Sequence, residues 1–98
     1  MEKQTPHCKL VVVHELVKAG KVRVTRSAMI GASDLGFGLA EMLKVVSGLV
    51  PGDFYKSMTT HADHMVWQDV YRPSTTAGDV YLKLTVIDDV LIVSFKEL

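Results

Sequence analysis

The stretch that decides the fold is DVYLKLTVIDDVLIVSFK, residues 79–96. Apolar side chains recur at every second position over residues 79–87, which predicts a β-strand with one face toward a core. Asp88-Asp89 fits a tight two-residue hairpin, and residues 90–96 form the returning strand. On the first strand, the predicted core face holds Val80, Leu82, Leu84 and Val86. The opposite face holds Tyr81, Lys83 and Thr85.

Two more strands are predicted upstream of this hairpin, over residues 54–60 and 65–72. A turn at 61–64 joins them, and a loop at 73–78 leads into the last hairpin. Because the links between consecutive strands are short, we expect an antiparallel meander. The turn Pro51-Gly52-Asp53 separates this half of the chain from the first half.

The first half has the 3.6-residue period of helices. Thr5-Pro6 is a suitable helix start, and apolar residues at helical spacing continue to Gly20. A short strand at 22–24 follows, then a helix from Ser27, as N-cap, to about Ser33, and a third helix over residues 39–46. The sequence therefore predicts one α+β domain over residues 1–98, with N-terminal helices packed on a C-terminal antiparallel sheet.

Composition excludes several classes of protein. The chain has 98 residues, and no apolar run approaches the roughly 18–20 residues that a membrane helix requires. Cys8 is the single cysteine, so neither an internal disulfide nor a zinc cage of cysteines can form. These features favour an intracellular, cytoplasmic protein. Formal net charge is zero, with an excess of three basic residues in the first half and of three acidic residues in the second.

Strand parity suggests a cationic surface on the open side of the sheet. Side chains alternate between the two faces of a strand, so Gln68 and Arg72 share a face, and Lys56 and Met58 share one on the preceding strand. One arrangement consistent with parity gathers Lys56, Gln68, Arg72, Tyr81 and Lys83. Cleavage of a phosphodiester requires charge stabilisation, which Lys and Arg supply, and proton transfer, for which Tyr and Lys are candidates.

Two other groups of residues could carry chemistry or have plain structural roles. His61, Asp63 and His64 could ligate a transition metal and support a metal-dependent hydrolase, although the segment also fits a solvated turn. Cys8, near His7 and His14, could be a nucleophile with a base, but a lone Cys in a first helical turn is more often a small packing residue. We favour the structural interpretation for both.

Four sequence blocks resemble one known family. They are Asp53-Phe54-Tyr55-Lys56-Ser57-Met58-Thr59-Thr60, Trp67-Gln68-Asp69-Val70-Tyr71-Arg72-Pro73, Val80-Tyr81-Leu82-Lys83, and Val90-Leu91-Ile92-Val93-Ser94-Phe95-Lys96. In this order and at these separations they resemble the MqsR (motility quorum-sensing regulator) family of mRNA interferase toxins. The segments Thr5-Pro6-His7 and Arg26-Ser27-Ala28 agree as well. The resemblance covers essentially the whole chain.

The resemblance implies a RelE-like fold and a specific activity. Toxins of this type cleave single-stranded mRNA at short GC-containing, GCU-like sites, without the ribosome and without a metal or cofactor. The matching catalytic positions are Lys56, Gln68 and Tyr81. Tyr55, Met58 and Arg72 lie nearby in the family, and with Lys83 they are the candidate substrate-binding residues. The implied partner is a separate MqsA-type antitoxin with a zinc-binding domain and a helix-turn-helix domain; the zinc would belong to the antitoxin.

Two features depart from the family pattern. Members of the family can carry His where this chain has Asp88, and toxins that cleave RNA tend to be basic, whereas this chain is neutral. The rival interpretation is therefore a non-catalytic or degenerate toxin fold that binds RNA or protein.

Overall fold

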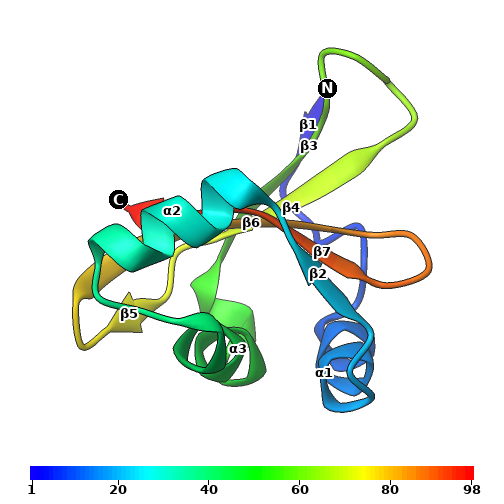
Figure 1. The fold of residues 1–98 in the computed structure, drawn as a ribbon. Coiled ribbons are helices and arrows are strands. Elements are labelled where there is room, and N and C mark those ends of the chain that lie inside the picture. Colours follow the sequence, from blue (N-terminus) through cyan, green and yellow to red (C-terminus); the bar gives the residue numbers. More distant parts are fainter.

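The computed structural model describes residues 1–98 and is built on one seven-stranded sheet (Figure 1). Its central part is the predicted meander, and every pair along it is antiparallel. Two short strands extend this meander at its edges, in the order β1-β3-β4-β6-β7-β2, and β5 pairs with β6 off this path. The strands are β1 (Glu2–Lys3), β2 (Val22–Val24), β3 (Phe54–Thr59), β4 (Trp67–Tyr71), β5 (Ser74–Thr75), β6 (Gly78–Val86) and β7 (Val90–Glu97).

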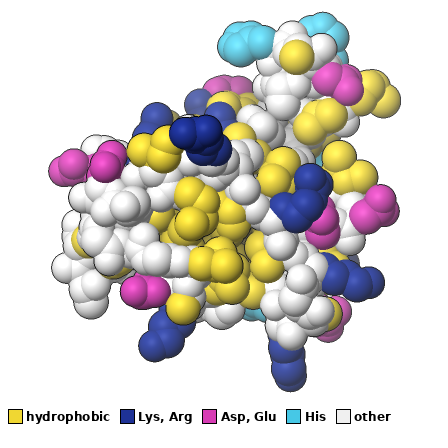
Figure 2. Space-filling model, in the orientation of Figure 1, with side chains coloured by type: hydrophobic (Ala, Val, Ile, Leu, Met, Phe, Trp, Pro, Cys, Tyr) yellow, Lys and Arg dark blue, Asp and Glu magenta, His cyan; other side chains and the backbone are white.

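The helices are α1 (Leu10–Lys18), α2 (Arg26–Asp34) and α3 (Leu39–Ser47), followed by a 3-10 turn, η1 (Pro51–Asp53). Side chains from all three helices join one core with the predicted inner face of β6, so the α+β prediction is confirmed. None of the helices is long and apolar enough to cross a membrane. Figure 2 shows the helical side, where hydrophobic side chains gather between α2 and α3 and charged ones surround them.

Helix α2 lies along the edge of strand β7, beyond the part that pairs with β2. Strand β2 pairs with β7 only as far as Ile92, and α2 then runs along the remainder of β7 (Figure 1). Gly31 of α2 lies directly against the Phe95 carbonyl group. The helix therefore covers a strand edge that would otherwise expose unpaired backbone groups.

Several boundaries predicted from the sequence are wrong. The first helix begins at Leu10 rather than at Thr5-Pro6, because the backbone N–H groups of His7 and Cys8 donate to the Asp69 carboxylate on β4, at 2.9 and 3.0 Å. Helix α2 begins earlier than predicted, since Thr25, not Ser27, is the N-cap and its Oγ1 accepts from the Ala28 N–H.

The sheet also differs from a purely antiparallel C-terminal meander. Strand β2 pairs with β7 in parallel, and β1, which lies in a segment with no predicted element, pairs antiparallel with β3. The turn of the last hairpin has three residues, 87–89, because Val86 pairs with Val90. Strand β5 lies in the segment predicted as a loop. The other strands and helices lie where the sequence predicted them, to within two residues.

The contact at Gly31 should reverse the usual effect of a Gly→Ala substitution in a helix on protein stability. Ala ordinarily stabilises a helix interior by up to about 1 kcal/mol relative to Gly. A Cβ at position 31 would overlap the Phe95 carbonyl oxygen, so we expect Gly31→Ala to destabilise the protein by about 1–3 kcal/mol, as overpacking does. Thermal unfolding monitored by circular dichroism should show Tm lower by several degrees.

The matched control is Ser33→Ala, an exposed position on the same helix, for which we expect a change in stability within about 0.5 kcal/mol. An unchanged or higher Tm for Gly31→Ala would contradict the packing of α2 against β7.

Candidate active site on the open sheet face

Strand register brings the predicted residues onto the sheet face opposite the helices. Lys56 of β3 lies opposite Val70 of β4, which in turn lies opposite Lys83 of β6. In the neighbouring row, Met58 lies opposite Gln68. Tyr81 is two residues from Lys83 on the same face of β6 and pairs with Lys96 of β7. The arrangement predicted from parity is therefore the one that the fold adopts; we call this surface the open face.

Val70 forms the apolar floor of the open face. It is fully buried, although it belongs to neither the helical side nor the main core cluster. Long side chains on the adjacent strands account for this burial, because Lys and Arg cover apolar surface with their methylene stems. Burial lowers the pKa of Lys83, and the positive charge of Lys96 lowers it further.

Lys56 has a partner that the sequence analysis did not identify. Its Nζ donates to Oε1 of Glu2, and the two form an ion pair between β1 and β3. The hydrogen bond to Glu2 is the main reason that the pKa of Lys56 lies above its ordinary value. The same bond lowers the pKa of Glu2. Lys56 is therefore an ammonium ion at neutral pH, suited to stabilising negative charge.

Tyr55 reaches the open face through an irregularity of the strand. The β3–β4 register shifts between Phe54 and Lys56, so Tyr55 is an extra residue in a bulge. Phe54 packs edge-on against the Tyr71 ring on the core side. The Arg72 guanidinium lies 3.5 Å from the centre of the Tyr55 ring, and Lys56 Nζ lies 5.5 Å from it. The bulge thus places an aromatic ring among cations.

Tyr81 lies in a cationic environment. Lys96 Nζ is 5.3 Å from the centre of its ring, and Tyr81 is among the groups that favour the charged form of Lys56. Lys96 is a member of the open face that the sequence analysis did not single out. The alternation of side chains along one strand does not show that Lys96 lies opposite Tyr81. Only the register of β7 against β6 shows this.

A hollow of about 490 Å³ lies where the open face meets β1 and the β3–β4 loop. Glu2 is its single carboxylate, and Gln68, Met58 and Lys83 line it as well. The remaining lining residues are Met1, Thr59, Thr60, His61 and Ala62. Because Glu2 lines the hollow and pairs with Lys56, the hollow lies beside the Lys56 ammonium group.

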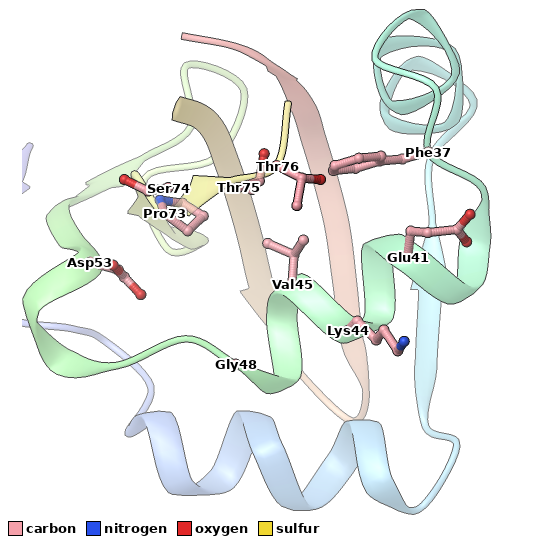
Figure 3. A pocket seen from close by; sticks show the side chains of 10 residues that line it. All are labelled: Phe37, Glu41, Lys44, Val45, Gly48, Asp53, Pro73, Ser74, Thr75 and Thr76. Atoms are coloured by element: carbon pink, nitrogen blue, oxygen red, sulfur yellow. The ribbon is translucent and has the colours of Figure 1, made fainter. Parts of the chain in front are cut away.

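The largest hollow, about 720 Å³, lies elsewhere, between α3 and the segment around β5 (Figure 3). Figure 3 shows Glu41 and Lys44 at one end and Asp53 at the other, with Val45 of α3 between them and Phe37 on the segment that precedes α3. Its lining contains neither His nor Cys, and none of the predicted site residues. Its two carboxylates, Glu41 and Asp53, outnumber its one cation, Lys44, which makes it a poor place for a phosphodiester.

The two alternative sites find no support in the geometry. No group of three His, Cys, Asp or Glu side chains lies close enough to hold a metal ion, and the Asp63 carboxylate accepts from the Met65 N–H instead. Burial and the nearby Asp69 carboxylate raise the pKa of Cys8. A raised thiol pKa disfavours the thiolate that nucleophilic catalysis requires.

Comparison with known proteins identifies the family of this chain. Residues 5–97 match the family described as "Motility quorum-sensing regulator, toxin of MqsA". The chain is also 61% identical over 97 residues to the mRNA interferase toxin MqsR of Escherichia coli strain K12, and the match covers 99% of each chain. A family match over nearly the whole length and an identity this high establish membership. The chain belongs to the MqsR family of motility quorum-sensing regulator toxins.

Proposed function

We propose that the open face cleaves RNA and that Lys56, Gln68 and Tyr81 are the catalytic residues. The chain is a toxin and an endoribonuclease, since it belongs to a toxin family and shares 61% identity with a full-length relative named an mRNA interferase. The observation that carries the assignment to the open face is the register of β3, β4 and β6. It gathers cations, an amide and a phenol on one face of the sheet, and Gln68 and Lys83 of this set line the hollow beside β1.

The proposed reaction is attack of a ribose 2′-hydroxyl on the adjacent phosphodiester. The 2′-hydroxyl loses a proton, a pentacoordinate phosphorane forms, and the P–O5′ bond breaks as the 5′-oxygen gains a proton. The products are a 2′,3′-cyclic phosphate and a 5′-hydroxyl. Lys56, held as an ammonium ion, stabilises the added charge on the phosphorane. Tyr81 is the candidate proton-transfer group, and Gln68 positions the ribose or the phosphate.

The surrounding residues suit binding of a single strand. Arg72 and Lys83 contribute charge for flanking phosphates, and Lys96 adds to them. Tyr55 and Met58 provide apolar contact for bases, Tyr55 with one face already covered by Arg72. The four basic residues of the second half of the chain gather on this one surface, which is how a chain of zero net charge can still bind RNA.

We further propose the specificity and partner that the family resemblance implies. The site would recognise short GC-containing, GCU-like sequences in mRNA in the cytoplasm. The antitoxin would be a separate MqsA-type chain with a zinc-binding domain and a helix-turn-helix domain. Asp88 lies at the tip of the β6–β7 hairpin, and its substitution for His leaves the three proposed catalytic residues unchanged.

Removing the charge or the proton-transfer group should abolish most of the activity. We expect Lys56→Ala and Tyr81→Phe to cleave a defined mRNA about 10²–10⁴-fold more slowly, the usual loss for one positioned acid–base group. Primer extension at several times measures the rate and locates the cut sites. Circular dichroism should show that both variants are folded, since neither residue belongs to the core cluster.

The matched control is Lys44→Ala, which removes the same side chain from α3 on the helical side. We expect its rate to equal that of the wild type. Cleavage by Lys56→Ala at the wild-type rate would contradict the assignment of the site.

The reaction should also need no divalent metal. The open face already holds cations to stabilise the phosphorane, so we expect unchanged rates in excess EDTA. His64→Ala should also leave the rate unchanged, because His64 does not line the hollow. Loss of cleavage in EDTA, with recovery on adding a transition metal, would instead support a metal-dependent hydrolase.

A further inference from the structure

Strand β1 adds a carboxylate to a site that is otherwise neutral or cationic. Glu2 pairs in register with Met58, and its side chain projects along the open face to Lys56. It is the one acidic residue that lines the hollow. Nothing in the chemistry of RNA binding calls for a carboxylate beside a phosphate-binding lysine, because the carboxylate and the phosphate repel each other. Its presence therefore requires another explanation.

We propose that Glu2 is a positioning residue for cleavage: it holds the Lys56 ammonium group beside the hollow, in place for the phosphorane. The inference rests on the proposed function, because it gives Glu2 a role only through Lys56. Lys has four rotatable side-chain bonds, and fixing such a chain before the substrate arrives lowers the entropic cost of the reaction. The carboxylate supplies a fixed acceptor for that purpose.

The backbone of β1 is well anchored for this role. The Thr59 N–H donates to the Met1 carbonyl oxygen at 3.0 Å, and Lys3 lies opposite Ser57 in the ladder. Lys3 Nζ also contacts His7 Nδ1 at 3.0 Å and lies 4.2 Å from the centre of the Trp67 ring. Glu2 thus projects from a strand held on both sides of it.

The ion pair between Glu2 and Lys56 contributes little to the stability of the fold, so a structural role does not explain it. The Glu2 side chain is 56% exposed and that of Lys56 is 23% exposed. Pairs so open to water contribute little to folding. Substitution of Glu2 should therefore leave the fold intact and act on the lysine alone.

The charges around Lys56 determine the effect of neutralising Glu2. Neutralising Glu2 removes the hydrogen bond that raises the pKa of Lys56 most and the negative charge that adds to it, so this pKa falls from its raised value. A lower pKa moves the loss of the ammonium, and of the activity that depends on it, to lower pH. The titratable groups that act on Lys56 directly are Glu2, Tyr55 and Tyr81. The other titratable or charged groups of the open face and the hollow are the Met1 amine before β1, Arg72 after β4, Lys83 from β6, Lys96 from β7, and His61 from the β3–β4 loop.

The test compares Glu2→Gln with the wild type in single-turnover cleavage of a GCU-containing oligoribonucleotide from pH 6 to about 11.5, a range that extends past the ordinary pKa of lysine. At saturating RNA we expect Glu2→Gln to react roughly 10-fold more slowly, in the range that misplacement of a catalytic group produces. The alkaline limb of its pH–rate profile should lie at lower pH than that of the wild type. The affinity for RNA should be unchanged or higher, because a negative charge has been removed.

Three further variants complete the experiment. Glu2→Asp keeps the charge and should restore part of the rate and the position of the alkaline limb. Glu2→Gln combined with Lys56→Ala should be no slower than Lys56→Ala alone, since a residue that acts through Lys56 adds nothing without it. Asp89→Asn removes a carboxylate from the other exposed ion pair, with Arg23 at the opposite edge of the sheet, and should leave the rate unchanged.

Glu2→Gln with the wild-type rate and pH profile, or with a faster rate at saturating RNA, would overturn the role of Glu2. An inactive wild-type protein, or a Lys56→Ala variant of wild-type rate, would instead contradict the proposed function itself. The two failures are therefore distinguishable in one set of assays.

Discussion

The buried carboxylate of Asp69 is the interaction on which the arrangement of the sheet and its site depends. Asp69 is 2% exposed, and its two oxygens accept from the N–H groups of His7 and Cys8. A buried charge of this kind is tolerated only where hydrogen bonds compensate for lost water. The bonds keep residues 7 and 8 out of helix α1 and fasten them to β4. The chain before them is thereby directed along β3, where β1 forms.

The consequence is a sheet with two different faces. The helical side buries the inner residues of β6 and β7 in a single core, which leaves the other face free of helices. That free face receives every second residue of three adjacent strands, so a few cations spread along the sequence become neighbours. Strand β1 then adds Glu2 at the edge of the same surface. The cationic site and its one carboxylate both result from strand pairing rather than from any local motif.

Most of the strands and most of the site residues could be predicted from the sequence. The features that were missed have physical reasons. Alternation is strong over β6 and β7, and it placed Tyr81 and Lys83 on the open face. Strand β1 has two residues, too few for a periodic signal. Strand β2 was predicted at residues 22–24, but its parallel pairing with the distant β7 was not. Glu2 meets Lys56 across 54 positions of sequence, and the bulge at Tyr55 breaks the parity on which the prediction relied.

The central claim is that RNA binds and reacts on the open face. The most direct test is chemical-shift mapping of the ¹⁵N-labelled protein with a GCU-containing oligonucleotide that carries 2′-O-methyl groups, which binds but lacks the attacking hydroxyl. We predict shifts concentrated in β1, β3, β4 and β6, with Lys56, Gln68 and Tyr81 among the largest. Shifts confined to α3 and the hollow around β5, with an unperturbed open face, would contradict the claim.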